Sequence, residues 1–198
     1  MDCAKIGRLI AQLRKEKALT QQSLAQALNV SNKTVSKWEC GLGCPDISLW
    51  ADLSVILGAE ISQLMEGEIT PNRPDAGNIK KVRFYVCPSC MNVLTSTGGA
   101  SIFCCGRKLE QLTASDNRNK PAIDVQVADI DYYITIDHEM TKESYILFTA
   151  YVKYDGFLLS RLYPEQSPSI RIPYQPGGTL YVYSTTGGLF SHEIARKR

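Results

Sequence analysis

Residues 19–41 read LTQQSLAQALNVSNKTVSKWECG, and this stretch decides the fold of the N-terminal part of the chain. Thr20 is a suitable N-cap for one helix, and Ser31 is a suitable N-cap for a second helix over about residues 32–39. Between them, Asn29 tolerates the left-handed backbone that a tight turn requires. The stretch therefore predicts two helices joined by a three-residue turn. Their shared core is expected to hold Leu24, Leu28, Val35 and Trp38.

The residues before this stretch predict another helix. Ile6, Leu9, Ile10 and Leu13 recur at the spacing of one helical face. Helical periodicity continues after the stretch, with almost no strand signal, to about residue 66.

This pattern resembles the helix-turn-helix of the Cro/lambda-repressor-like (XRE-type) regulators, and the match continues through PDISLW at residues 45–50 to Leu64. Asn29 stands where that family usually has glycine. The resemblance implies a five-helix DNA-binding domain over residues 1–66. It also implies an ion pair between Arg14 and Glu39 that joins the first helix to the third, and a double-stranded DNA operator as the partner.

The candidate DNA-binding residues follow from placing the helix over residues 32–39 in the major groove. Side chains at its N-terminal end then reach base edges or phosphates; the amide of Asn32 suits adenine, and the ammonium of Lys33 suits guanine. The start of the preceding helix can hold a phosphate. The full set is Gln21, Gln22, Ser31, Asn32, Lys33, Thr34, Ser36 and Lys37. Two half-sites about one helical turn apart need two such helices, so we expect a homodimer.

Composition narrows the classes of protein that remain. With 198 residues, 44% of them hydrophobic and 21% charged, the chain is typical of globular proteins. The net charge of +2 is too small to indicate nucleic-acid binding by itself. No apolar run approaches about 18 residues, and the N-terminus lacks a signal-peptide pattern. We therefore expect a cytoplasmic protein with no membrane partner.

A second motif lies beyond a linker rich in proline and glycine, which we place at residues 67–79. Cys87-Pro-Ser-Cys90 is followed after thirteen residues by adjacent Cys104-Cys105. Four thiolates close a tetrahedral metal site, and a module over residues 80–115 is too small to fold without such a staple or a neighbouring domain. Sulfur ligands alone suit zinc or iron, so zinc is expected and iron is the alternative. The motif resembles the desulforedoxin-like module of desulfoferrodoxins, whose members hold iron in a rubredoxin-like centre.

Cys3, Cys40 and Cys44 lie outside this metal pattern. In a cytoplasmic protein, cysteines are not expected to form a disulfide framework, because that compartment keeps thiols reduced. We expect the three to be unpaired and to behave as small buried hydrophobic residues. A thiol switch between Cys40 and Cys44 is the alternative.

Residues 116–198 contain alternating, tyrosine-rich runs broken by glycine and proline, which predict an antiparallel β-sandwich. The matching stretches are KPAI at residues 120–123, DYYITIDHEMTKESYI at 131–146 and GTLYVYSTTGGLF at 178–190. Through them, residues 116–190 resemble the immunoglobulin-like iron domain of desulfoferrodoxin and superoxide reductase, which binds ferrous iron with four histidines and one cysteine. Carried over by position, these ligands become Asn119, His138, Ser144, Ser184 and Gly187. Only His138 keeps a ligand of the family, so we expect the sandwich to be retained and the iron site lost.

The expected fold class is a multidomain α plus β chain: a five-helix DNA-binding domain, a small four-cysteine metal module and an immunoglobulin-like antiparallel sandwich. The expected function is a sequence-specific transcriptional regulator, not an enzyme, whose β region serves dimerisation or sensing. The alternative is an iron-dependent, superoxide-reactive protein or redox sensor fused to a DNA-binding domain. The sequence does not identify a small-molecule effector.

Overall fold

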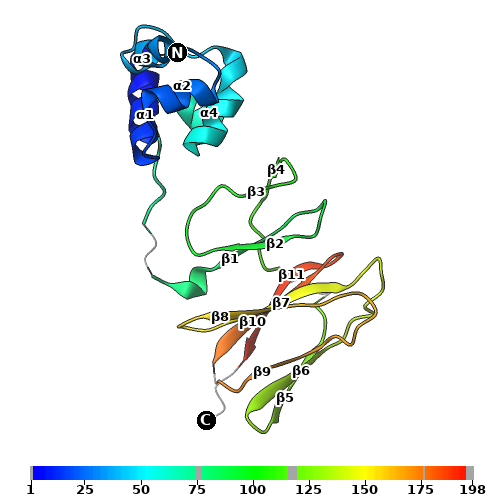
Figure 1. The fold of residues 1–198 in the computed structure, drawn as a ribbon. Coiled ribbons are helices and arrows are strands. Elements are labelled where there is room, and N and C mark those ends of the chain that lie inside the picture. The colour runs from blue at the N-terminus through cyan, green and yellow to red at the C-terminus, as the bar shows by residue number, and fades with distance from the viewer. Residues whose placement is uncertain (1, 75–76, 116–119, 176, 195–198) are drawn as a thin grey trace. The chain divides into compact units, whose positions relative to one another are not determined.

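The structure is a computed structural model that describes residues 2–74, 77–115, 120–175 and 177–194. The chain forms two compact units, residues 1–71 and residues 72–198 (Figure 1). None of the helices in the described ranges is both long enough and apolar enough to cross a membrane.

The first unit is helical. Its elements are α1 (Cys3–Glu16), α2 (Gln21–Ala27), α3 (Asn32–Glu39), the 3-10 turn η1 (Ile47–Leu49), α4 (Trp50–Leu57) and α5 (Ile61–Glu66). The predicted caps are confirmed: Thr20 Oγ1 accepts the backbone N–H of Ser23 at 3.0 Å, and Ser31 Oγ accepts that of Thr34 at 3.1 Å. Asn29 adopts the expected left-handed backbone, with φ of 54°.

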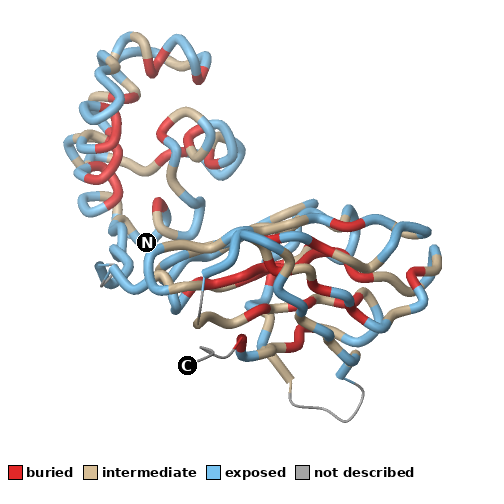
Figure 2. The backbone as a smooth tube through the Cα atoms, turned by 90° about the horizontal axis from the view of Figure 1, so that it is seen from below, coloured by how far each residue is buried: buried red, intermediate tan, exposed pale blue. Residues whose placement is uncertain are grey.

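One hydrophobic core holds the five helices together, and the buried segments of the tube in Figure 2 follow it. It contains Ile6, Leu9, Ile10, Leu13, Leu24, Ala25, Leu28, Val35, Trp38, Trp50, Leu53, Leu57 and Leu64. Helices α1 and α3 are in direct backbone contact, because a Cβ atom on Gly7 would lie 1.9 Å from the carbonyl oxygen of Trp38. Only glycine fits at that crossing.

The expectation that Cys3, Cys40 and Cys44 are all unpaired is wrong. Cys3 and Cys44 form a disulfide. Cys3 begins α1, and Cys44 lies in the loop after α3, so the contact of α1 with α3 brings their Cα atoms to 5.1 Å, within disulfide reach. Cys40 is unpaired but exposed rather than buried, since it caps α3 on the solvent side.

The second unit is built of strands after one 3-10 turn, η2 (Ile79–Lys81). The strands are β1 (Arg83–Val86), β2 (Val93–Ser96), β3 (Phe103–Cys104), β4 (Arg107–Lys108), β5 (Ile123–Ala128), β6 (Asp131–Ile136), β7 (Ile146–Val152), β8 (Phe157–Arg161), β9 (Ser169–Pro173), β10 (Gly178–Ser184) and β11 (Gly188–Ile194). A four-stranded sheet of order β11-β10-β7-β8 and a three-stranded sheet of order β5-β6-β9 form the predicted sandwich, and all described pairings are antiparallel. The hairpins β1-β2 and β3-β4 form the cysteine region.

The cysteine region shares a core with the sandwich. Every residue of β7 is buried, although a sheet facing solvent on one side would alternate. One face of β7 packs toward the other sheet, while Phe148, Ala150 and Val152 share a cluster with Phe84 of β1. The rings of Phe84 and Phe148 are 5.5 Å apart. The hairpin β1-β2 therefore covers the outer face of the four-stranded sheet.

Candidate DNA-binding surface and four-cysteine site

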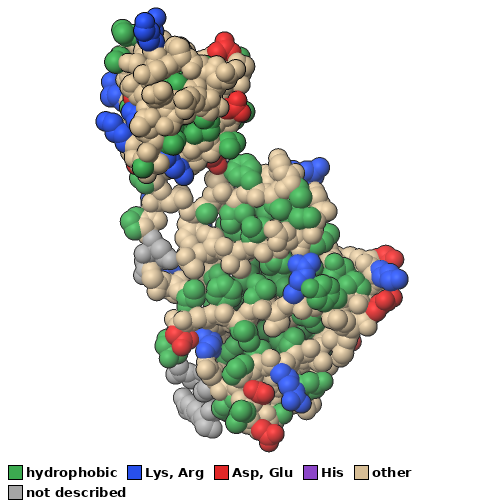
Figure 3. Space-filling model, in the orientation of Figure 1, with side chains coloured by type: hydrophobic (Ala, Val, Ile, Leu, Met, Phe, Trp, Pro, Cys, Tyr) green, Lys and Arg blue, Asp and Glu red, His purple; other side chains and the backbone are tan. Residues whose placement is uncertain are grey.

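Helix α3 divides its side chains between core and solvent as a recognition helix requires. Val35 and Trp38 are buried, whereas Asn32, Lys33 and Lys37 are exposed. Lysine and arginine side chains line the side of the helical unit formed by α1 and α3 (Figure 3). The polar face of α3 is thus available to a partner without disturbing the core.

The remaining predicted contact residues lie around the start of α2 and α3. Gln22 is exposed, and Thr34 and Ser36 are half-buried. The hydroxyls of Ser31 and Thr34 are hydrogen-bonded to each other at 2.8 Å, beside the capping bond. These two side chains therefore fix the N-terminal turn of α3.

Gln21 belongs to a network that joins three helices. Arg14 Nε and Nη2 donate to the two carboxylate oxygens of Glu39 at 2.6 and 2.9 Å, and Gln21 Nε2 donates to Glu39 Oε2 at 2.8 Å. The implied Arg14–Glu39 ion pair is confirmed. Burial raises the pKa of Glu39, but the hydrogen bonds from Arg14 and Gln21 outweigh it and lower that pKa. The amide of Gln21 keeps a second N–H for another acceptor; its bond to Glu39 was not predicted from the sequence.

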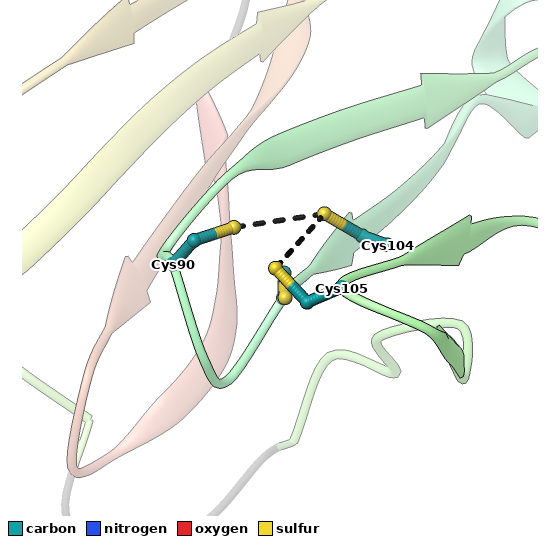
Figure 4. Close-up of side chains that lie close together, drawn as sticks. Cys90, Cys104 and Cys105 are labelled. Atoms are coloured by element: carbon teal, nitrogen blue, oxygen red, sulfur yellow. Dashed lines mark hydrogen bonds between the residues drawn. The ribbon is translucent and has the colours of Figure 1, made fainter.

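The structure brings the four predicted metal ligands together. The sulfur atoms of Cys87, Cys90, Cys104 and Cys105 all lie within 4.8 Å of one another. Cys90 Sγ lies 3.6 Å from Cys104 Sγ, which lies 4.0 Å from Cys105 Sγ, and Figure 4 shows these three side chains turned toward one another. Four sulfurs bound at about 2.3 Å to one tetrahedral ion are about 3.8 Å apart. The spacing therefore fits a metal ion.

Local backbone explains how adjacent cysteines can face one site. Cys104 pairs with Arg107 across β3 and β4, so Cys105 and Gly106 form a two-residue hairpin turn. Both have positive φ, 50° and 73°, which is the requirement of a type I′ turn. This turn places the two sulfurs 4.0 Å apart.

The first cysteine pair forms the expected knuckle. Desolvation raises the pKa of Cys87, but backbone N–H groups of Cys90 and Ser89 hydrogen-bond its sulfur, and the net result lowers that pKa from 9.0 to about 6. Hydrogen bonds from the Cys105 thiol to the neighbouring sulfurs, that of Cys90 first, raise the pKa of Cys105 to about 12. Without a metal, the sulfur of Cys87 is thus favoured as a thiolate, while the closeness of the other sulfurs opposes a second negative charge at Cys105. A cation would relieve that conflict.

The positions implied as iron ligands hold a hydrogen-bonded network of a different kind. His138 Nε2 lies 3.0 Å from Ser184 Oγ, and Ser144 Oγ lies 2.8 Å from Thr186 Oγ1. Ser184 is buried and also accepts from the backbone N–H of Gly187 at 3.4 Å. Asn119 lies outside the described residues. Serine hydroxyls and a glycine are poor ligands for ferrous iron, so the residues present do not fit the family's iron centre.

The tautomer of His138 also argues against Ser184 as a nucleophile activated by this histidine. The backbone N–H of Met140 donates to Nδ1 at 3.1 Å, so the neutral ring carries its proton on Nε2 and donates to Ser184. A nucleophilic serine needs the opposite direction, with the histidine accepting the hydroxyl proton. His138 and Ser184 therefore form a structural pair.

The N-terminal part of the chain is similar to known helix-turn-helix proteins. Residues 10–71 match the model of the HTH_3 helix-turn-helix family. The HTH-type transcriptional activator BcrR of Enterococcus faecalis is 37% identical over 83 residues, which span 39% of each protein. The chain thus covers about two fifths of that relative's length.

Solved structures similar to the chain include a superoxide reductase and a gene regulator. The superoxide reductase of Treponema pallidum is 17% identical, with a TM-score of 0.48 and coverage of 56% of this chain and 96% of its own. The clp gene regulator ClgR of C. glutamicum is 25% identical, with a TM-score of 0.31 and coverage of 34% and 87%. The match to the family model defines the helical unit as a helix-turn-helix domain, a DNA-binding class. In particular, residues 10–71 are an HTH_3 domain of the XRE type.

Proposed function

We propose that the protein is a sequence-specific DNA-binding transcriptional regulator. The observation that carries this proposal is the division of α3, whose exposed Asn32, Lys33 and Lys37 face solvent over a core fixed by Val35 and Trp38. A rigid helix that offers an amide and two ammonium groups can read base edges and hold phosphates. The relative BcrR is described as a transcriptional activator, which supports the same class of function.

Within this proposal the full predicted set, Gln21, Gln22, Ser31, Asn32, Lys33, Thr34, Ser36 and Lys37, forms the DNA-binding surface. The protein's place of action is the cytoplasm. It acts as a homodimer on double-stranded DNA, because one copy of α3 cannot reach two half-sites about one helical turn apart. Selecting duplexes from a random pool with the full chain tests this. A two-fold symmetric consensus supports the proposal, and binding of all duplexes alike contradicts it. Sedimentation of the selected complex gives the number of chains.

The four-cysteine site holds one metal ion as a structural staple, with zinc favoured over iron. Cys87, Cys90, Cys104 and Cys105 fill all four positions, which leaves none open for a substrate. The ion would supply cross-linking of β1-β2 to β3-β4. Elemental analysis with a visible spectrum on protein purified without oxygen decides the metal, since zinc–thiolate sites are colourless and iron–thiolate sites absorb visible light.

The β-sandwich serves dimerisation or sensing and does not reduce superoxide. The alternative, an iron enzyme fused to a DNA-binding domain, needs ligands where the chain has Ser144 and Ser184, and these hydroxyls are bonded within the network around His138. A second iron per chain in the same elemental analysis would overturn this part of the proposal. Superoxide-dependent oxidation of the purified protein would do so as well.

A further inference from the structure

The disulfide between Cys3 and Cys44 joins α1, which contacts α3, to the loop that follows α3. Cys3 is the first residue of α1, and Cys44 lies in the loop that leads from α3 to η1. Cys44 also packs against the hydrophobic core of the unit. The bond therefore attaches the loop after the recognition helix to the start of the first helix.

The centre of this loop, residues 40–46, faces solvent. Leu42 is 77% exposed, and no atom lies within 4 Å of a Cβ atom built on Gly43, although the backbone N–H of Leu42 donates to the carbonyl of Lys37 at 2.9 Å. Gly41 is the exception, because a Cβ atom there would lie 2.9 Å from the Cα of Ala4, next to Cys3. The loop thus approaches the first turn of α1, where Cys3 forms the disulfide.

Opening the disulfide would not undock α3. The Arg14–Glu39 ion pair and the contact of Gly7 with Trp38 hold α3 against α1 independently of the sulfur atoms. The expected result of reduction is a folded domain whose loop 40–46 is more mobile. Because the loop continues directly from the C-cap of α3, ordering it when DNA binds to α3 would cost additional entropy in the reduced form.

A DNA-binding protein works where thiols are kept reduced, and disulfides there are usually transient, either catalytic or redox-sensing. We propose that Cys3 and Cys44 form a reversible oxidation site that sets the affinity of the helical unit for DNA; this inference rests on the proposed function. On oxidation the two thiols lose two electrons and two protons to glutathione disulfide, which becomes two molecules of glutathione. Reduction is the reverse reaction.

The oxidised form is the tighter DNA binder, because its loop is ordered before DNA arrives. The effect is reciprocal, since a state that binds DNA more tightly is itself stabilised by DNA to the same extent. A fivefold difference in Kd corresponds to a reduction potential about 20 mV more negative in the presence of saturating DNA, at about 30 mV per factor of ten. The coupling between DNA binding and disulfide formation can therefore be measured in two independent ways, as a ratio of Kd values and as a shift in reduction potential.

The test uses full-length, metal-loaded protein in glutathione buffers and the best duplex that each redox state selects from a random pool. Alkylation adds mass to each free thiol, so the intact mass reports whether the disulfide between Cys3 and Cys44 is formed. We expect the oxidised wild type to bind at least about fivefold more tightly than the reduced protein. The double variant Cys3→Ser/Cys44→Ser should bind like the reduced wild type in both buffers.

Cys40→Ser is the matched control, because Cys40 is free, exposed and in the same loop. It should keep the full redox ratio and the DNA-dependent shift in potential. Equal Kd values for oxidised and reduced wild type would overturn the proposal. So would a ratio that persists in the double serine variant, which would assign the response to the four-cysteine site. Absence of selective DNA binding in both redox states would instead remove the proposed function, and the switch with it.

Discussion

Arg14 and Glu39 form a two-point ion pair between α1 and α3, with Nε–Oε1 at 2.6 Å and Nη2–Oε2 at 2.9 Å. Their side chains are only 10% and 7% exposed, and Arg14 Nη1 donates to the carbonyl of Leu19 at 2.7 Å. The pair therefore fixes α3 against α1 from the buried side, while the opposite side of α3 stays free. A buried ion pair fixes the position of the two helices, because separating them would leave each charge buried without its partner.

Glu39→Gln should lower the free energy of unfolding of the helical unit by about 3 kcal/mol. The substitution keeps the shape of the side chain but leaves the guanidinium of Arg14 buried without a counter-charge. Urea unfolding followed by circular dichroism measures this loss. Glu66→Gln, at an exposed position of α5, is the control and should cost less than about 0.5 kcal/mol. If Arg14→Met/Glu39→Leu is no more stable than Glu39→Gln, the loss does not come from an unpaired charge.

The same pair predicts a pH dependence of stability. The pKa of Glu39 is lowered in the folded protein, because the hydrogen bonds from Arg14 and Gln21 outweigh burial. Its contribution is therefore complete above the unfolded pKa, near about pH 4.5, and is lost as the pH falls through the folded pKa. The stability difference between wild type and Glu39→Gln should be constant near neutral pH and shrink below about pH 4.5. A difference that grows on acidification would contradict the lowered pKa.

Lys33→Ala should weaken binding to the selected duplex by about 1–3 kcal/mol, roughly 5- to 150-fold, and relax the preference at one base pair. Gln21→Ala should weaken binding to all sequences alike, because the proposed placement of α3 puts the start of α2 against phosphate rather than bases. Titrations against the selected duplex and its single-base variants separate the two effects. Lys142→Ala is the control, since it removes the same charge from a side chain that is 72% exposed in the β unit. If Lys33→Ala changes neither affinity nor preference, α3 is not in the major groove as placed here.

Local signals made most of the helical unit predictable. Thr20, Asn29 and Ser31 act within three or four residues of their own positions, so the caps and the turn follow from the sequence. The four sulfurs were also predictable, because each pair is close in the chain. The Cys3–Cys44 disulfide joins residues 41 positions apart and depends on how closely α1 approaches α3. Sequence spacing carries no information on that approach, and the assumption of a reducing compartment argued against the bond.

Cys104→Ser/Cys105→Ser should abolish metal binding and destabilise the β unit. The two thiols leave the site with half of its ligands, so the cross-link between β1-β2 and β3-β4 is lost. Elemental analysis should give no bound metal at this site, and thermal unfolding should show a lower Tm for the β unit only. Cys40→Ser is the matched control, because it removes a free thiol outside the site. Full metal content in the double variant would mean that the ion is held elsewhere.

Ser184→Ala should destabilise the β-sandwich by about 1–3 kcal/mol, because it leaves the buried end of the His138 ring without a hydrogen-bond acceptor. The Ser184 hydroxyl accepts from His138 Nε2 at 3.0 Å and is itself 3% exposed as a residue, so water cannot easily replace it. Urea unfolding of the full chain measures the loss in the β-unit transition. Ser167→Ala is the control, since Ser167 is exposed and its hydroxyl bonds that of Ser169, at the start of β9, at 3.1 Å. If the network is structural, Ser184→Ala changes stability and leaves metal content at one ion per chain. A loss of a second metal ion in Ser184→Ala would mean instead that the position still serves as a ligand.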